Sequence, residues 1–263
     1  MSPHRARKRF GQHFLHDPAV IERIVAAIAP QTSDAVVEIG PGQGALTGPL
    51  LTAATRLDAV EIDRDLAAML RERYAASAGF TLHEADALTF DWHALARQRG
   101  TALRVVGNLP YNISTPLLFR LAEAADVISD MHFMLQKEVV DRIVAEPGSG
   151  DYGRLTVMLA ARTSAERVLD VGAGAFRPVP RVNSSVVRLS IRSAPAEWSR
   201  SEFYARIVSA AFNQRRKTLR NSLRTYLSAE QIEAVGIDPG VRAETLSPPQ
   251  FGALAQAAAA VFH

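Results

Sequence analysis

The chain has 263 residues, which is enough for one large domain or for one domain with a small appendage. Hydrophobic residues make up 48% of it and charged residues 22%, as in ordinary globular proteins, and the absence of cysteine excludes disulfides, thiolate metal sites and cysteine nucleophiles. The formal net charge is only +3, although the pI is about 9.5 and the basic residues are unevenly distributed.

Basic residues gather in two places. Residues 1–16 form a basic arm, and a second cluster lies in the last quarter of the chain. Their members are Arg5, Arg7, Lys8 and Arg9 in the arm, and Arg215, Arg216, Lys217, Arg220 and Arg224 in the second cluster. Two such clusters favour a polyanionic partner such as RNA. Each cluster alone is also typical of a solvated surface.

The sequence indicates neither a membrane segment nor a metal site. The first ten residues lack the apolar core of a secretory signal, and the apolar run over residues 253–262 is too short to span a bilayer. The seven histidines are scattered without metal-ligand spacing. We therefore expect a monomeric cytoplasmic protein without a metal.

The first half of the chain alternates predicted strands and helices. Asp17 and Pro18 are typical of a helix start, and an apolar stripe continues that helix to residue 28. Further strands are expected over 35–39, 57–62, 80–83, 103–106 and 131–135, and helices over 45–51, 66–74, 114–121 (capped by Ser114 or Thr115) and 137–145. This alternation predicts an α/β fold with a parallel, doubly wound sheet.

The second half changes character. A helix over 154–161 precedes two strands, 167–171 and 184–191, which we expect to form a hairpin. Residues 192–200 are typical of a linker, and helices are expected beyond it over 203–212, 217–227, 229–235 and 249–262. We therefore predict two domains, residues 1–192 and a small helical, RNA-binding domain over residues 198–263.

A glycine-rich turn, residues 40–44, follows the first predicted strand of the sheet, where glycine allows the backbone to approach a ligand closely. Two interpretations are open. Gly40, Gly42 and Ala45 fit the G-x-G-x-x-A pattern of dinucleotide sites. Glu38 with the glycines fits E-x-G-x-G-x-G, which resembles the first motif of S-adenosylmethionine-dependent methyltransferases.

Later strand ends favour the methyl donor. Glu61 closes the second strand of the sheet, where an acid can bind a pair of ribose hydroxyls, and Asp86 follows the third strand, where it suits the adenine amine. Solvated carboxylates are equally common at strand ends. Together with the fourth strand end, however, these residues form an ordered set of candidate ligand contacts.

The fourth strand end is Asn108-Leu109-Pro110-Tyr111. Pro110 fixes its own φ and keeps Leu109 extended, so the carbonyls there are held in place. Asn108 adds an acceptor and Tyr111 a stacking face. The tetrapeptide resembles the Asp/Asn/Ser-Pro-Pro-aromatic element of methyltransferases that act on amino groups of nucleobases or glutamine, although an ordinary turn is an alternative.

Four segments carry a closer resemblance. They are Arg7-Lys8-Arg9-Phe10-Gly11-Gln12-His13-Phe14-Leu15, Glu38-Ile39-Gly40-Pro41-Gly42-Gln43-Gly44-Ala45-Leu46-Thr47, Asn108-Leu109-Pro110-Tyr111-Asn112 and Asn213-Gln214-Arg215-Arg216-Lys217-Thr218-Leu219. Together they resemble the ribosomal RNA adenine dimethyltransferase family, nearest its small-subunit branch. The resemblance implies a Rossmann-like class I methyltransferase fold, S-adenosyl-L-methionine as cofactor, and the immature small ribosomal subunit as partner. It also implies two methyl transfers to each of two adjacent adenines near the 3′ end of 16S rRNA.

The resemblance also implies roles for individual residues. The implied donor contacts are His13, Leu15, Glu38, Gly40, Gly42, Glu61, Asp86, Ala87 and Asn108. The implied catalytic residues are Asn108, Leu109, Pro110, Tyr111 and Phe176, with the rings of Tyr111 and Phe176 stacking on the target base. The implied RNA contacts are Arg7, Lys8, Arg9, Arg215, Arg216, Lys217 and Arg220. The family usually has Asn where this chain has His13.

Other functions stay open. The macrolide-resistance branch, which acts on large-subunit rRNA, shares the core chemistry, but the helical tail favours the small-subunit branch. A non-catalytic assembly factor would use the same RNA surface, but the intact glycine turn, the acids and residues 108–111 argue against a loss of catalysis. A nicotinamide dehydrogenase is the weakest alternative, because it leaves residues 108–111 and the basic clusters unexplained.

Overall fold

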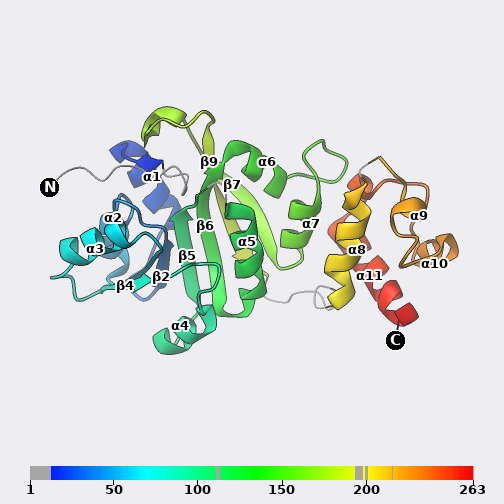
Figure 1. Ribbon diagram of the computed structural model, residues 1–263, viewed down its shortest axis with the longest axis horizontal. Helices are drawn as coiled ribbons and strands as arrows, with labels where there is room; N and C mark the ends of the chain where they lie inside the picture. The colour runs from blue at the N-terminus through cyan, green and yellow to red at the C-terminus, as the bar shows by residue number, and fades with distance from the viewer. Residues whose placement is uncertain (1–12, 111–112, 193–197, 199–200, 215, 263) are drawn as a thin grey trace. The chain divides into compact units, whose positions relative to one another are not determined.

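The computed structural model describes residues 13–110, 113–192, 198, 201–214 and 216–262. The chain divides into two compact units (Figure 1). The first comprises Met1–Val140 and Ala165–Ile191, and the second comprises Asp141–Ser164 and Arg192–His263. Among the described helices, none combines the length and the apolar character needed to cross a bilayer.

A seven-stranded sheet forms the centre of the first unit. Its order is β4-β3-β2-β5-β6-β9-β7, and its strands are β2 Ala35–Ile39, β3 Leu57–Glu61, β4 Phe80–Glu84, β5 Leu103–Asn108, β6 Ile128–Gln136, β7 Thr163–Val171 and β9 Ser184–Ile191. The strands from β4 to β6 are parallel to their neighbours, which confirms the α/β expectation. β9 is antiparallel to β6, so the sheet is mixed. The connection from β7 to β9 contains no α-helix, whereas a parallel connection between neighbouring strands usually needs one.

Helices flank this sheet in the expected alternation. α1 spans Pro18–Ile28, and the Asp17 carboxylate accepts hydrogen bonds from the amides of Ala19 and Val20 at 2.9 and 3.2 Å. The other α-helices of the unit are α2 Thr47–Ala54, α3 Arg64–Arg73, α4 Trp92–Arg99 and α5 Ser114–Glu123. The predicted cap of α5 is wrong: Ile113 occupies the cap position, and Ser114 is already helical and buried.

One hydrophobic core holds α1 and α2 on the sheet. It joins Ile24 and Ile28 of α1 to Leu50 of α2 and to Val106 of β5. The same core receives a two-stranded sheet of β1 Phe14–Leu15 with β8 Phe176–Arg177, which are antiparallel. This pairing brings the segment before α1 beside the loop that precedes β9, and the sequence did not indicate it.

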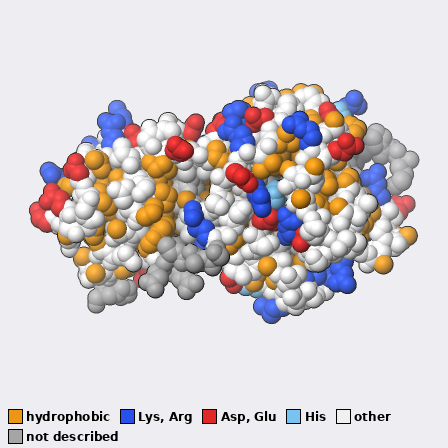
Figure 2. Space-filling model, turned by 180° about the vertical axis from the view of Figure 1, so that it is seen from behind, with side chains coloured by type: hydrophobic (Ala, Val, Ile, Leu, Met, Phe, Trp, Pro, Cys, Tyr) orange, Lys and Arg blue, Asp and Glu red, His pale blue; other side chains and the backbone are white. Residues whose placement is uncertain are grey.

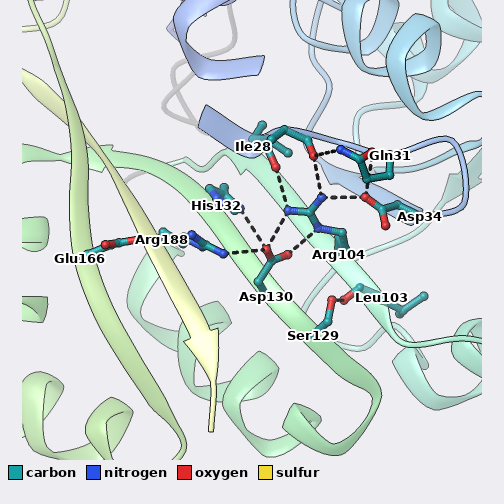
Figure 3. Close-up of polar contacts among 11 residues, drawn as sticks. Ile28, Gln31, Asp34, Leu103, Arg104, Ser129, Asp130, His132, Glu166 and Arg188 are labelled. Atoms are coloured by element: carbon teal, nitrogen blue, oxygen red, sulfur yellow. Dashed lines mark hydrogen bonds and ion pairs between the residues drawn. The ribbon is translucent and has the colours of Figure 1, made fainter. Parts of the chain in front are cut away.

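A buried ion cluster fastens the end of α1 to the sheet (Figure 3). The Arg104 guanidinium donates to both Asp130 oxygens, with Nε–Oδ1 2.9 Å and Nη2–Oδ2 2.8 Å, and to Asp34 Oδ2 at 2.7 Å. It also donates to the carbonyls of Ile28 at 2.7 Å and Ala29 at 3.3 Å. These carbonyls lie at the C-terminal end of α1, where a cation is favourable.

The second unit is helical. Its elements are α7 Arg154–Ala160, α8 Glu202–Asn213, α9 Leu219–Ser222, α10 Ala229–Ala234 and α11 Pro248–Phe262, and α6 Lys137–Ile143 crosses the boundary between the units. α9 is shorter than predicted, because Thr218 before it pairs with Arg242 and the chain after it forms turns over residues 223–226. The expected domain division leaves residues 141–164 with the first domain, whereas here this segment packs with the C-terminal helices.

Side chains explain that arrangement. The hydroxyl of Tyr152 donates to the Leu246 carbonyl at 2.6 Å, and the hydroxyl of Tyr204 donates to the Val157 carbonyl at 3.0 Å. Tyr152 and Val157 are buried in one core with Phe251 and other residues of the last 70 positions. Residues 141–164 therefore supply part of the second unit's core.

Candidate functional site

A cavity of about 300 Å³ lies at the carboxyl ends of the parallel strands in the first unit. Ligands bind at this edge in open α/β sheets. Every donor contact that the resemblance implies lines it: His13, Leu15, Glu38, Gly40, Gly42, Glu61, Asp86, Ala87 and Asn108. The sequence missed apolar lining residues, namely Phe14, Ile62, Leu66, Leu88 and Ile113, because their types give no binding signal.

The glycine turn forms one wall of the cavity. Gly40, Gly42 and Gly44 have φ values of +63°, +57° and +80°, a conformation that favours glycine. At Gly42, an added Cβ would lie 3.2 Å from the ring of Phe14, which itself lines the cavity. The turn therefore needs glycine both for its backbone conformation and for close packing beside the cavity.

The carboxylate of Glu61 is buried and held from two sides. One oxygen accepts from the Gly42 amide at 3.2 Å and the other from the Asp63 amide at 2.9 Å. Burial raises the pKa of Glu61, and these amide hydrogen bonds lower it. Each oxygen retains acceptor capacity, so the arrangement can receive hydroxyl groups.

Glu38 is deeper, with 2% of its surface exposed. Its Oε2 accepts a hydrogen bond from Thr47 Oγ1 at 2.7 Å, which ties the end of β2 to the first turn of α2. Burial raises the pKa of Glu38 to about 7; the Thr47 hydrogen bond lowers it, and the nearby Glu61 carboxylate raises it further. The sequence did not single out Thr47 as a partner.

Asp86 lies in the turn after β4. Its Oδ1 accepts from the Leu88 amide at 2.9 Å, and the adjacent Ala85 amide donates to the Glu61 carbonyl at 3.1 Å. These contacts fix the turn beside the end of β3. Asp86 and Glu61 therefore line the same cavity, as the parallel arrangement of their strands predicts.

Asn108 is the last residue of β5, the strand next to β2 on the side away from β3. Its Nδ2 donates to the His13 carbonyl at 3.1 Å. Because a carbonyl only accepts, the nitrogen side of the amide faces His13 and the Oδ1 acceptor is left for another donor. The position before it, Gly107, requires glycine, because a Cβ there would clash with the Ile39 carbonyl of the neighbouring strand.

The next residues continue the acceptor array. The Leu109 amide donates to the Met134 carbonyl at 3.2 Å, and the Pro110 carbonyl accepts from the Ile113 amide at 3.2 Å. Leu109 and Pro110 both line the cavity. Tyr111 and Asn112 lie outside the described residues. The Pro110 carbonyl is thus engaged within the turn, whereas none of the described residues donates a hydrogen bond to the Leu109 carbonyl.

His13 connects the cavity to a distant loop. A ring nitrogen, Nδ1, lies 2.8 Å from the Pro178 carbonyl, so Nδ1 carries the hydrogen of this bond. Pro178 belongs to the loop after β8, next to Phe176. His13 therefore links the donor cavity to this loop.

Phe176 differs from its predicted role. Its exposed fraction is 0%, it packs in the core with Leu15 and Val106, and it does not line the cavity. The pairing of β8 with β1 draws it inward. In this arrangement the ring stabilises the core and offers no free face to a base.

The predicted RNA contacts are spread over the chain. Arg7, Lys8, Arg9 and Arg215 lie outside the described residues. Arg216, Lys217 and Arg220 belong to the second unit, where all three are exposed. On the face shown in Figure 2, basic and acidic side chains are interspersed, without a single large basic area. No cluster of potential metal ligands occurs among the residues that the structure describes.

Comparisons with known proteins identify the family of this chain. Residues 3–260 match the family model of ribosomal RNA adenine dimethylase. Ribosomal RNA small subunit methyltransferase A of Aromatoleum aromaticum is 56% identical, with 97% of this chain and 94% of that protein covered. The protein of the same name from Pseudomonas aeruginosa is 53% identical, with coverage of 96% and 94%.

Solved structures agree on the fold. The 23S rRNA methyltransferase ErmE has a TM-score of 0.71 and 29% identity, with 93% of this chain and 98% of that chain covered. A dimethyladenosine transferase from Plasmodium falciparum has a TM-score of 0.77 at 24% identity, with coverage of 92% and 96%. These likenesses confirm the Rossmann-like methyltransferase fold.

Proposed function

This chain belongs to the ribosomal RNA adenine dimethylase family, and from that premise we propose that it dimethylates two adjacent adenines near the 3′ end of 16S rRNA. It is an S-adenosylmethionine-dependent enzyme of the rRNA (adenine-N,N)-dimethyltransferase class. Its proposed substrate is the rRNA of the immature small subunit in the cytoplasm, and it acts as a monomer. The observation that carries the proposal is the convergence of Asn108, Glu61 and Asp86 on one cavity.

The residues around the cavity fit the donor. Glu61 offers two fixed oxygens to a ribose hydroxyl pair, and Asp86 offers a carboxylate to an amine. Gly42 leaves room that a Cβ would close against Phe14. When bound, S-adenosylmethionine supplies a methyl group on a positively charged sulfonium. We assign its binding to the nine lining residues that the resemblance implies.

The target amine would be held by acceptors. An adenine amine is a weak nucleophile, because its lone pair is delocalised into the ring. Asn108 Oδ1 and the Leu109 carbonyl would each accept one of its N–H groups, which favours a pyramidal nitrogen with its lone pair directed at the methyl group. Catalysis then depends on positioning and electrostatics, and no strong general base is needed because the amine becomes acidic once methylated.

The target base must leave its stack in the RNA loop. We assign the stacking face to Tyr111, at a value of roughly 1–3 kcal/mol per base. Phe176 can share this role only if its ring leaves the core that it now fills. The basic arm and Arg216, Lys217 and Arg220 would contact phosphates, which position RNA without reading its sequence.

The relatives favour the small subunit over the large one. Proteins named for the small subunit are 51–56% identical to this chain, whereas the 23S rRNA enzyme is 29% identical. The test is methyl transfer from labelled S-adenosylmethionine to small subunits that lack dimethyladenosine, with large subunits in parallel. We expect dimethyladenosine in 16S rRNA only. Label in the large subunit, or none in either, would overturn the proposal.

A further inference from the structure

One face of α3 runs from the donor cavity to the glycine turn. Leu66 lines the cavity, and Leu70 and Arg73 follow it at the spacing of successive turns of the helix. The helix is also fixed at its start, because the amide of its capping residue, Asp63, donates to the Glu61 carboxylate at 2.9 Å. The first turn of α3 is therefore attached to the same carboxylate that lines the donor cavity.

The last turn of α3 packs closely around Gly44, the final glycine of the glycine turn. Gly44 is buried. A Cβ added to it would lie 3.3 Å from each of three atoms: Leu70 Cδ2, Arg73 Nη1 and the hydroxyl oxygen of Tyr74. The ring of Tyr74 in turn packs on Phe80, the first residue of β4, with the ring centroids 4.8 Å apart. The end of α3 is thus in close contact with the turn and fixed to the sheet.

Hydrogen bonds reach the backbone of the glycine turn from two sides. The Gly40 amide donates to a carbonyl of β3 at 2.9 Å, and the Gly42 amide donates to the Glu61 carboxylate at 3.2 Å. From α3, Arg73 Nη1 donates to the Gln43 carbonyl at 2.6 Å. β3 therefore holds the first half of the turn, and Arg73 holds the second half.

A guanidinium is well suited to this contact. Hydrogen bonds from a charged donor are shorter and stronger than those between neutral groups. Arg73 lies in the last turn of α3, where the helix dipole favours a positive charge. The side chain is exposed, so solvent screens its charge and its contribution to the stability of the whole fold is small. Gln43 lines the donor cavity, so the contact acts on the shape of the cavity wall.

We propose that Arg73 is a positioning residue for the methyl donor. By holding the Gln43 carbonyl it keeps the second half of the glycine turn in the conformation that binds S-adenosylmethionine. The proposal rests on the proposed function, which supplies the donor. Arg73 is not among the described residues that line the cavity, so it acts through Gln43. Its loss is expected to weaken donor binding and to leave the transfer step unchanged, because Asn108 belongs to β5 and keeps its place.

The first test is calorimetric titration of the full chain with S-adenosylmethionine. Arg73→Met removes the donors and keeps most of the length of the side chain, and its Kd is expected to be about threefold to tenfold higher. Arg73→Lys retains a charged donor and should recover most of the affinity. Arg97→Met removes an exposed charge from the last turn of α4 and is the matched control. Equal Kd values for Arg73→Met and the wild type would overturn the proposal.

A second readout separates positioning from a general loss of structure. Amide hydrogen exchange is measured on the protein without donor. Arg73→Met is expected to speed exchange at Gly44, whose amide donates to the Pro41 carbonyl within the turn at 2.8 Å, and to leave exchange at Gly40, which β3 holds, unchanged. Equal acceleration at both glycines, or none at Gly44, would contradict the positioning role. So would a lower stoichiometry of donor binding at an unchanged Kd, because it would indicate a misfolded fraction.

Enzyme assays separate this proposal from the proposed function. With saturating small subunits, Arg73→Met should raise the KM for S-adenosylmethionine and retain kcat, and a fall in kcat at an unchanged KM would overturn the positioning role. If the wild type binds the donor but methylates neither subunit, the proposed function fails, and weaker binding by Arg73→Met still supports the positioning role. If the wild type methylates 16S rRNA and Arg73→Met binds the donor normally, only the positioning role fails. Absence of donor binding by the wild type would overturn both.

Discussion

The side-chain amide of Asn108 donates to the carbonyl of His13, 95 residues earlier in the chain, at 3.1 Å. This one contact decides which atom of the amide is left for a substrate. With Nδ2 occupied, Oδ1 is an oriented acceptor before any ligand arrives. Preorganisation of this kind is the main way in which an enzyme stabilises a transition state without a strong base.

Replacement of Asn108 by alanine removes the oriented acceptor. We expect methyl transfer to fall by about 100-fold to 1,000-fold, with the thermal unfolding midpoint nearly unchanged because the residue is only partly buried. Asn108→Asp keeps the size but loses the N–H that His13 accepts, so its activity should also be low. Single-turnover assays with 16S rRNA measure both variants. Near-normal turnover by Asn108→Ala would refute the assigned role.

Gly107→Ala tests the close approach of β5 and β2. The new Cβ would clash with the Ile39 carbonyl, a backbone atom that cannot move without disturbing the glycine turn. We expect a loss of about 3 kcal/mol in the free energy of unfolding. Gly172→Ala is the control, because an added Cβ there would meet no atom within 4 Å and its φ is −68°. Urea unfolding curves compare the two, and similar midpoints would contradict the clash.

Glu38→Gln tests the buried carboxyl. Between pH 4.5, its ordinary pKa, and about 7, the folded protein keeps a proton that the unfolded chain has released. The free energy of unfolding therefore decreases as pH rises through this range, by on the order of 3 kcal/mol from this group. Glutamine carries no such charge, so the variant should lose this part of the pH dependence.

The Glu38→Gln measurement is urea unfolding at several pH values from 4.5 to above 7, with Glu22→Gln as control. Glu22 is exposed on α1, so its substitution makes the same charge change at a solvated position. If Glu38→Gln and the wild type have parallel profiles, Glu38 does not titrate as its burial indicates.

Arg104→Gln tests the buried ion cluster of Figure 3. It leaves Asp130, which is 7% exposed, without its bidentate partner, and a buried charge that has lost its partner costs about 3–5 kcal/mol. Arg71→Gln breaks the exposed pair with Glu84 at 3.1 Å and should cost less than about 1 kcal/mol. Calorimetric unfolding measures the loss of stability in each variant. Equal losses in the free energy of unfolding would contradict the prediction, because they would show that the Arg104 cluster contributes no more to stability than an exposed ion pair.

The central strands and the strand-end residues could be predicted from the sequence, because both depend on local patterns. β2 was predicted over its full range, 35–39, since a short apolar run meets a glycine turn. α4 was missed because Trp92–Arg99 has only a short apolar stripe among charged residues. β1 and β8 have two residues each and exist only through their mutual pairing.

Long-range contacts set the limit of the sequence interpretation. The partners of Arg104 lie 26, 70 and 76 residues away from it, and no spacing rule connects them. Phe176 illustrates the same limit. Its place in a family motif suggests a stacking ring, whereas its pairing partner Leu15 draws it into the core. A cavity in the second unit is likewise lined by residues of α7, α8 and α9, so no single segment indicates it.

The pairing of β1 with β8 has a consequence for synthesis of the chain. Leu15 pairs with Phe176, and the imidazole of His13 binds the carbonyl of Pro178, although the two residues are 165 positions apart and His13 is made first. The strand that pairs with β1 is therefore absent until about two thirds of the protein has been translated, although Asn108, which binds the His13 carbonyl, is made earlier. A nascent chain that ends before residue 176 contains the residues of the glycine turn and both acids, but it lacks β8, the strand that pairs with Phe14 and Leu15 beside the cavity.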